Sequence, residues 1–334
     1  MIDTIYIEEA VLSHDKTEKI LARFPKARRV VCERYGEIFN RKSQSFRAQK
    51  IQPSLVLAQK HQNFVLEAPA NYGVGGKYNF YFSHMMNCLY DCRYCFLQGM
   101  YRSAHYVVFV NYEDFDQGIV EKLAQTEGEE TWFFSGYDCD SLALEPVTDF
   151  IAHTLDTFPK HKNAWLELRT KSTQVRALLA RPVLDNCVVA YSISPKEIID
   201  AYEHKTPSLE NRLNAALKLQ QAGWKIGLRF DPVIYHADFE QIYATMFNQV
   251  FARLEADKIH SVSLGGFRLP ESFYKSMVKM HPYEVLFAGP LEKNEQAMMA
   301  YKSELERSML AFCEQEILKH INADCYFPCT GDMS

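Results

Sequence analysis

The sequence predicts an α/β fold: a partial (β/α)6 barrel with an N-terminal extension and a C-terminal helix. Two observations lead to this prediction. From residue 78 onward, six short apolar runs rich in β-branched and aromatic residues alternate with longer amphipathic segments, which is typical of βαβ units around a parallel sheet. Six strands are two short of a closed eight-stranded barrel, so we expect an open barrel whose wide side accommodates a large substrate.

The expected strands are short and apolar, and they lie at 78–82, 132–135, 165–169, 188–192, 226–231 and 261–264. The helices between them show apolar residues at three- and four-residue spacing, and they lie at 113–125, 145–157, 209–222 and 239–255. In the third of these helices, Leu209, Leu213 and Ala216 illustrate the apolar face. Gly223 follows it, where the glycine that ends a helix is usually found.

The chain contains no internal repeat and no flexible linker, so we expect a single compact monomer. We divide it into a basic N-terminal region at 1–77 packed on the barrel, the barrel at 78–295, and a C-terminal helix and tail at 296–334. Within the last part, residues 296–321 are expected to form one long helix.

The composition excludes several classes of protein. Of the 334 residues 47% are hydrophobic and 24% are charged, which excludes a collagen-like, low-complexity or largely disordered chain. No run approaches the roughly 18 consecutive apolar residues that identify a membrane span, and the first residues include neither a basic start nor an apolar signal stretch. We therefore expect a cytoplasmic protein with no membrane partner.

The net charge of -5 hides a basic stretch near the N-terminus. Between residues 21 and 60 there are ten Lys and Arg residues and only two acidic ones, Glu33 and Glu37. Aromatic residues are interleaved with these cations, as in surfaces that track phosphates and stack on bases. A solvated charged surface with no ligand is the alternative interpretation.

Nine cysteines in a chain without a secretion signal favour metal binding over disulfides. Three of them, Cys88, Cys92 and Cys95, are separated by three and two residues directly after the first expected strand. This spacing lets one loop hold three corners of a [4Fe–4S] cluster, whose fourth iron is left without a protein ligand. A structural zinc site would need a fourth ligand, for which His84 and His105 are the near candidates, and buried free thiols are the remaining alternative.

A looser set of cysteines lies near the C-terminus, where Cys325 and Cys329 follow Cys313. An auxiliary cluster is one interpretation of this set. Two or three cysteines without a fourth ligand are more often free thiols, which is what we expect here.

An iron without a protein ligand offers the open site that S-adenosylmethionine (SAM) needs, and the cysteine motif with Phe96 directly after it resembles the radical SAM superfamily. Further stretches are similar to the spore photoproduct lyase family, whose members reverse the thymine dimer lesion of irradiated spore DNA. The similarity extends from residue 50 to residue 327 with gaps, and its main stretches are 88–98, 110–114, 169–171, 191–193, 202–209, 222–229 and 231–236.

The resemblance implies a set of cofactor-binding residues, with Cys88, Cys92 and Cys95 holding the cluster and Ser141, Lys171 and Ser192 contacting the methionine part of SAM. The last three lie at or just after the carboxyl ends of expected strands, where barrel enzymes assemble their active sites. A lysine there can offer a cation to the SAM carboxylate, and the two hydroxyls can hydrogen-bond to its polar groups.

The resemblance also implies catalytic residues. Cys139 matches the family cysteine that donates a hydrogen atom to the product radical, and Tyr94 matches a family tyrosine inside the cysteine motif. Phe96 departs from the family, because it stands where the lyase has a second tyrosine that relays hydrogen towards SAM. Tyr137 is the candidate to replace that tyrosine.

The function that the resemblance implies is a radical SAM DNA repair lyase, with damaged DNA and a one-electron donor such as flavodoxin or ferredoxin as partners. The segment 283–296 departs from the family's basic DNA-engaging hairpin, and no basic hairpin is expected there. Together with Phe96, this departure supports an alternative, a radical SAM enzyme of the same family that acts on a different substrate, such as another nucleic-acid modification. A third alternative is a non-catalytic iron–sulfur or zinc protein that binds nucleic acid through residues 21–60.

Overall fold

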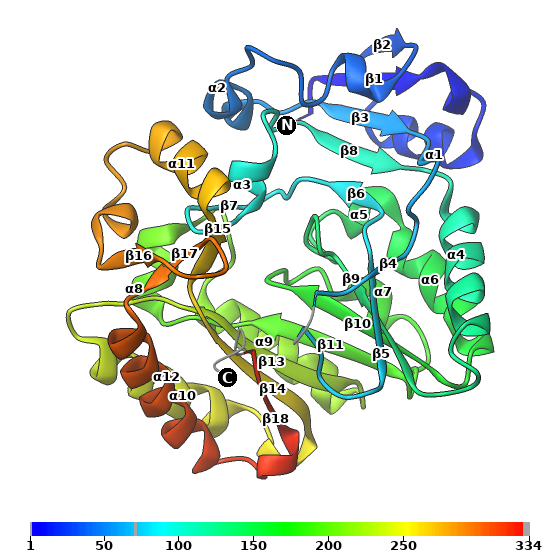
Figure 1. Ribbon diagram of the computed structural model, residues 1–334. Helices are drawn as coiled ribbons and strands as arrows, with labels where there is room; N and C mark the ends of the chain where they lie inside the picture. Colours follow the sequence, from blue (N-terminus) through cyan, green and yellow to red (C-terminus); the bar gives the residue numbers. More distant parts are fainter. Residues whose placement is uncertain (1, 70–71, 330–334) are drawn as a thin grey trace.

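The computed structural model describes residues 2–69 and 72–329 of the chain, and its main feature is a curled eight-stranded sheet (Figure 1). Six parallel strands form its centre, and they are β5 (Tyr78–Phe82), β9 (Thr131–Ser135), β10 (Ala164–Thr170), β11 (Cys187–Ser192), β13 (Lys225–Val233) and β14 (Ile259–Gly266). They pair in chain order, as expected of successive βα units. The predicted six-stranded partial barrel is confirmed.

Two short strands extend the sheet at its edges. The strand β18 (Tyr326–Pro328) pairs parallel to β14, and β4 (Leu66–Glu67) pairs antiparallel to β5. These edge strands do not pair with each other, so the sheet formed by the described residues is open on one side. The open side is the wide side that the strand count predicts.

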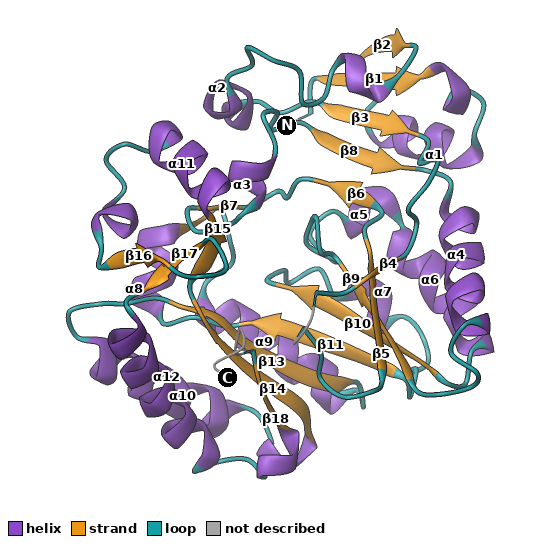
Figure 2. Ribbon diagram, in the orientation of Figure 1, coloured by secondary structure: helices purple, strands orange, loops and turns teal. Residues whose placement is uncertain are grey.

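Helices cover the outer face of the curled sheet (Figure 2). They are α4 (Tyr112–Ala124), α6 (Phe150–Thr157), α7 (Arg176–Leu179), α8 (Lys196–Tyr202), α9 (Leu209–Gln221), α10 (Phe239–Arg253) and α12 (Ser303–Leu318). Three of the four predicted helices are confirmed as α4, α9 and α10. None of the helices within the described residues is long and apolar enough to cross a bilayer.

The helix predicted at 145–157 is divided in two, α5 (Glu145–Thr148) and α6. Asp149 separates them with a left-handed backbone, φ 48°. The Glu145 carboxylate then accepts the Ile151 and Ala152 N–H groups at 2.9 and 3.1 Å, so it satisfies the free donors at the start of α6. The two helices pack against different cores, since Val147 of α5 contacts the core of the second sheet and Ile151 of α6 belongs to the barrel core.

A second sheet lies above the barrel in Figure 1. Its strands, in spatial order, are β2 (Arg28–Cys32), β1 (Thr4–Glu8), β3 (Leu55–Ala58), β8 (Tyr106–Phe109) and β6 (Met85–Met86). The helix α1 (Asp15–Arg23) packs beside it, and its core includes Ile5, Leu57 and Val108. This sheet contains strands from before and after residue 77 in the sequence. The division of the chain at residue 77 stays a prediction.

The prediction of one helix over 296–321 is wrong at its start. Met298–Tyr301 forms the strand β17, which pairs with β15 (Arg268–Pro270) and β16 (Leu291–Lys293). Tyr301 is 3% exposed, and its hydroxyl oxygen accepts the Tyr235 N–H at 2.9 Å, so tertiary contacts favour the strand. The helix α12 begins only at Ser303.

A hairpin is therefore present in the segment where no basic hairpin was expected. The Asn294 side chain closes its turn by accepting the N–H groups of Gln296 and Met298 at 3.1 and 2.9 Å. Its exposed charges are mixed, since Glu292 and Glu295 flank Lys293. The charge of this hairpin is mixed and not basic, as expected. A hairpin nevertheless forms in this segment.

Candidate active site

Four neighbouring strands end at one edge of the barrel, and each is followed by candidate site residues. The cysteine loop follows β5, Cys139 and Ser141 follow β9, Lys171 follows β10, and Ser192 ends β11. Because these strands are adjacent and parallel in the sheet, their carboxyl ends meet on the same face. The structure therefore brings together residues separated by up to 104 positions in the chain.

The cysteine loop is attached to the barrel by a two-residue pairing. Its strand β7 (Asp91–Cys92) runs antiparallel to β12 (Glu203–His204), with Cys92 opposite Glu203. Cys92 is 7% exposed, and the Tyr90 N–H donates to the Cys88 Sγ at 3.5 Å. Backbone N–H groups directed at ligand sulfurs are characteristic of iron–sulfur sites.

Two lysines lie close to the three thiols. Burial raises the pKa of Cys92 and of Cys95, and the nearby Lys171 ammonium counteracts this for both thiols. Lys50 from α2 (Phe46–Ile51) is buried at 7% exposure and donates to the Cys88 carbonyl at 2.7 Å. The surroundings can therefore stabilise thiolates once a metal replaces their protons.

The donor set fits an iron–sulfur cubane. Among the described residues, no three His, Cys, Asp or Glu side chains converge closely enough to ligate one metal ion. A [4Fe–4S] cluster does not need that convergence, because each thiolate binds a different iron. Three thiols on one loop, of which Cys92 is buried and the other two are half-buried, match what such a cluster requires, as do the N–H group directed at sulfur and the two neighbouring cations.

Cys139 lies in the loop after β9, on the same barrel face as the cysteine motif. Burial raises the pKa of its thiol well above the usual value, and the nearby Cys88 thiol and Asp138 carboxylate raise it further. The Asp138 N–H is fixed by the Ser83 hydroxyl at 3.0 Å, which ties this loop to the end of β5. The environment thus keeps an S–H bond on Cys139.

Asp140 is a buried carboxylate that organises two neighbouring strand ends, and the sequence did not identify it as a site residue. One oxygen accepts the Leu142 and Ala143 N–H groups at 3.0 and 2.9 Å and the Thr170 hydroxyl at 2.7 Å. The other accepts the Lys171 N–H at 2.7 Å. Asp140 therefore holds the loop that carries Cys139 against the one that carries Lys171.

Ser141 packs against a glycine turn. Its hydroxyl donates to the Ser135 carbonyl at 2.9 Å, and its N–H donates to the Arg169 carbonyl at 3.1 Å. Gly136 has φ +84°, and a Cβ there would lie 2.5 Å from the Ser141 Oγ. Only glycine fits this turn, which keeps the serine next to the strand end.

The carboxylate of Glu203 is the centre of a buried polar network. The sequence did not identify Glu203 as a site residue either. It accepts hydrogen bonds from the Tyr94 hydroxyl, from the Arg212 guanidinium and from the Ser194 hydroxyl, the last at 3.0 Å. Burial alone would raise the pKa of Glu203, but Arg212 and Lys171 hold it below the usual value. Burial would lower the pKa of Lys171, and Glu203 raises it instead, so the lysine stays charged.

The predicted residues Tyr94 and Ser192 both contact this network. Lys171 Nζ lies 5.7 Å from the centre of the Tyr94 ring, and Tyr94 is 7% exposed. The Ser192 carbonyl accepts from Arg212 at 3.1 Å, while the Ser192 side chain lies at the carboxyl end of β11. The cation and the hydroxyl are thus held on neighbouring strands.

Aromatic side chains line the neighbouring part of the barrel edge. The ring of Tyr137 lies 4.3 Å from that of Tyr81 and 5.8 Å from that of Tyr72, measured between centroids. On another side it meets Phe96, at 5.5 Å. The structure therefore places the predicted residue Tyr137 beside the phenylalanine that departs from the resemblance.

The comparisons with known proteins agree with this geometry. The sequence model described as spore photoproduct lyase matches residues 75–280, which is more than half of the chain. The chain belongs to the spore photoproduct lyase family. Curated spore photoproduct lyases from Clostridium acetobutylicum and Bacillus subtilis are 23% and 25% identical over 205 and 177 residues. These matches cover 61% and 53% of this chain, and 61% and 52% of the two relatives.

Solved structures of spore photoproduct lyase show the same fold. A variant with bound AdoMet and dinucleoside spore photoproduct matches with a TM-score of 0.83 and 18% identity, covering 99% of each chain. A complex with dinucleoside spore photoproduct matches with a TM-score of 0.82 and 18% identity, covering 99% of this chain and 98% of that one. The fold predicted from the resemblance is confirmed.

The two histidines considered as zinc ligands, His84 and His105, contact residues outside the cysteine motif. His84 is 1% exposed and stacks on Phe150 at 3.8 Å, and burial lowers its pKa to about 3. The His105 Nδ1 accepts the Ser54 N–H at 2.9 Å. Neither forms part of a three-ligand metal group within the described residues.

The cysteines near the C-terminus lie on separate elements. Cys313 is fully buried in α12, Cys325 lies in the turn before β18, and Cys329 follows that strand. The Cys329 N–H donates to the Leu264 carbonyl at 2.7 Å. They do not form a three-ligand metal group in the part of the chain that the structure describes.

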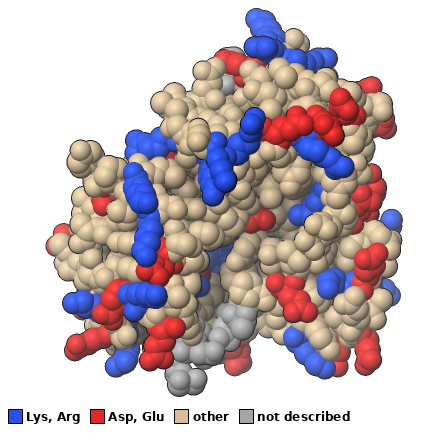
Figure 3. Space-filling view, turned by 45° about the horizontal axis from the view of Figure 1, so that its top comes forward, with Lys and Arg blue, Asp and Glu red and all other residues tan. Residues whose placement is uncertain are grey.

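The expectation of a base-stacking surface over residues 21–60 is wrong for its aromatic residues. Phe39 and Phe46 are 4% and 6% exposed and belong to the core, and Tyr35 packs edge-on against Phe109. Most cations of this stretch are exposed, whereas Lys50 is buried beside the cysteine loop. The space-filling view shows Lys and Arg side chains above the hollow near its centre (Figure 3). Composition alone could not distinguish aromatic residues that stack on bases from aromatic residues that pack in the core.

Proposed function

We propose that this chain is a radical SAM lyase that repairs the spore photoproduct, a methyl-bridged thymine dimer, in DNA. One observation carries the proposal: the three-cysteine loop, Lys171 and Cys139 meet at the carboxyl ends of adjacent barrel strands. The family match and the spore photoproduct lyase structures with bound lesion and AdoMet support it. The matched stretches span 61% and 52% of these two curated relatives' length, so substrate and activity are proposals for this chain.

Cys88, Cys92 and Cys95 hold the [4Fe–4S] cluster, and Ser141, Lys171 and Ser192 hold SAM. A reduced cluster bound at these cysteines would supply the one electron that cleaves SAM, and the 5′-deoxyadenosyl radical so released would abstract a hydrogen atom from the saturated thymine ring. Lys171 is kept cationic by Glu203 and offers its charge to the SAM carboxylate. Asp140 positions Lys171 through the 2.7 Å bond to its backbone N–H.

Cys139 then donates its hydrogen atom to the thymine radical that remains after the methyl bridge breaks. Its buried thiol carries the proton and the weak S–H bond that this step needs. Tyr94 and Tyr137 supply phenolic O–H groups for returning hydrogen towards SAM. Phe96 cannot, because it has no O–H group.

An anaerobic assay tests the proposal. The reconstituted protein is incubated with dithionite, SAM and a synthetic spore photoproduct dinucleotide, and thymidylyl-thymidine and 5′-deoxyadenosine are separated by chromatography. Restored thymidylyl-thymidine supports the lyase. If 5′-deoxyadenosine accumulates and no thymidylyl-thymidine forms, the lyase assignment fails and a second radical SAM substrate must be sought.

A second candidate function has its own observations. Phe96 replaces the expected tyrosine, and the β16–β17 hairpin carries mixed instead of basic charge. Both features favour a radical SAM enzyme of the same family with a different nucleic-acid substrate. We further propose a cytoplasmic, monomeric protein that receives single electrons from a flavodoxin- or ferredoxin-type donor.

A further inference from the structure

A pocket of about 620 Å³ lies outside the barrel, between α2, α3 (Leu97–Met100) and α11 (Glu271–Met280). Its lining includes Arg47, Arg102 and Lys279 and no Asp or Glu. All three cations are exposed, and none of them has a carboxylate within ion-pair distance among the described residues. The pocket thus combines a free positive charge with apolar walls.

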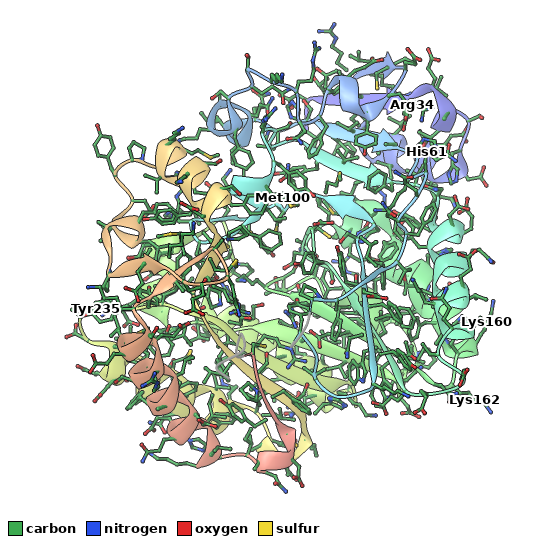
Figure 4. All side chains as sticks on the ribbon, viewed as in Figure 1. Arg34, His61, Met100, Lys160, Lys162 and Tyr235 are labelled. Carbon is green, nitrogen blue, oxygen red and sulfur yellow. The ribbon has the colours of Figure 1, made fainter. Side chains whose placement is uncertain are left out.

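The apolar walls of this pocket are firmly packed. Met100, Phe273 and Met280 line it, and Met100 is labelled in Figure 4. The helices α3 and α11 touch at Gly99, where a Cβ would lie 2.5 Å from the Phe273 Cβ. The two walls therefore approach each other as closely as backbone allows, which gives the pocket a preformed shape.

A chain of hydrogen bonds connects this pocket to a cluster ligand. Arg47 Nη1 lies 2.9 Å from His281 Nδ1, and His281 Nε2 lies 2.7 Å from Gln98 Oε1. The Gln98 amide then donates to the Cys92 carbonyl at 2.7 Å. His281 and Gln98 are both buried, and Gln98 lines the pocket as well, so one side chain joins the pocket wall to the cysteine loop.

The pocket and the proposed SAM-binding residues belong to different elements. Gln98 and Gly99, directly after the motif, face the pocket, whereas Lys171 and Cys139 lie at the strand ends of the barrel. Neither Cys139 nor any of the proposed SAM-binding residues lines the pocket. The position suits a partner that must approach the cluster and not the substrate.

We propose that this pocket is the docking site of the electron donor, an acidic one-electron carrier protein of the flavodoxin or ferredoxin type. This inference rests on the proposed radical SAM function. The reduced donor loses one electron and the [4Fe–4S] cluster gains it, with no other reactant. The chain as a whole has a net charge of -5, so attraction of an acidic partner depends on local groups of cations such as those of this pocket.

A charge-reversed variant tests the docking site. Arg102→Glu with Lys279→Glu changes the charge of the pocket, and Arg47 is kept because it bonds to His281. The matched control is Lys160→Glu with Lys162→Glu, which makes the same change in net charge on the opposite side of the molecule (Figure 4). Purified bacterial flavodoxin and ferredoxin are the probes, in their oxidised form for the binding measurement and in their reduced form for the electron-transfer measurement.

Donor binding is measured by calorimetry with the cluster-free protein at low ionic strength, and reduction of the loaded cluster is followed by stopped-flow absorbance. We expect the pocket variant to lose about tenfold or more in affinity and in second-order reduction rate, with a flatter salt dependence. The control is expected to stay within about twofold of the parent. SAM cleavage driven by dithionite should be equal in all three proteins.

Other results overturn the proposal. Equal donor binding and reduction rates in the pocket variant and the control would do so. A loss of binding to a lesion-containing oligonucleotide in the pocket variant would instead identify the pocket as a nucleic-acid surface. If the parent protein fails to cleave SAM with dithionite, the proposed function fails, while the calorimetric comparison still decides the docking site.

Discussion

The ring of Phe96 lies 5.5 Å from the ring of Tyr137, at an interplanar angle of 51°. Phe96 belongs to the cysteine motif, and Tyr137 belongs to the loop after β9 that also carries Cys139. A phenolic O–H therefore stands beside the position where the family resemblance expects one. We propose that Tyr137, from a neighbouring strand end, takes over the role of the missing hydroxyl.

Changing Tyr137→Phe should uncouple SAM consumption from repair. Without a phenol beside Phe96, hydrogen return to SAM slows, and the ratio of 5′-deoxyadenosine to restored thymidylyl-thymidine should rise several-fold. The ratio is measured by chromatography after anaerobic turnover. Adding Phe96→Tyr to the Tyr137→Phe variant should lower this ratio again.

Tyr81→Phe is the control for this prediction, because it removes a hydroxyl from the same aromatic group at 4.3 Å from the Tyr137 ring. An unchanged ratio in the Tyr137 variant would show that this tyrosine serves packing alone.

Changing Cys139→Ala should separate radical formation from product formation. The thiol no longer quenches the thymine radical, so thymidylyl-thymidine should fall by about tenfold or more while 5′-deoxyadenosine continues to form. Both products are followed in the same assay. Cys187→Ala, which changes a buried cysteine in β11, is the control. Equal thymidylyl-thymidine yields in the two variants would exclude Cys139 as the donor.

Changing Asp140→Asn should weaken SAM binding without removing the cluster. The amide keeps one oxygen that can accept from Leu142, Ala143 and Thr170, and it places an NH2 group where the second carboxylate oxygen accepts the Lys171 N–H. Lys171 therefore loses its position. We expect the KM for SAM to rise about tenfold, with a smaller change in kcat. Iron content and the melting temperature distinguish this from unfolding, and a fall in kcat alone would contradict a positioning role.

Changing Glu167→Gln should destabilise the barrel in a pH-dependent way. Burial alone would raise the pKa of Glu167, but Arg229 and Arg169 lower it from 4.5 to about 2. Because the folded-state pKa is depressed, its stabilisation is present above pH 4.5 and is lost as the pH falls towards 2. The variant leaves Arg229 buried without its partner, which costs about 3 kcal/mol or more at pH 7.

Urea unfolding at pH 7 and at pH 3 measures this effect. The difference in the free energy of unfolding between parent and variant should be smaller at pH 3. Glu129→Gln is the control, because its pair with Lys77 is exposed and contributes little. A gap that is independent of pH would contradict the assignment of the stabilising group to Glu167.

Local patterns in the sequence were sufficient to predict the six central strands and the order in which they pair. Each strand is a short apolar run, and parallel βαβ units connect neighbours in chain order, so the strand ends and the residues after them could be placed on one face. Cys88, Cys92 and Cys95 were found in the same way, because their spacing is a property of one loop. The roles of Ser141, Lys171, Ser192 and Cys139 depended on family resemblance in addition.

Only the tertiary structure revealed the groups that support these residues. Glu203 approaches Tyr94 because β12 pairs with β7, and Asp140 reaches Lys171 because β9 and β10 are neighbours. The strand at Met298–Tyr301 likewise forms because Tyr235 and the β15 strand lie against it. Spacing along the chain determines what one loop can hold, whereas hydrogen bonds between distant segments depend on how the strands pack, and the sequence by itself does not display them.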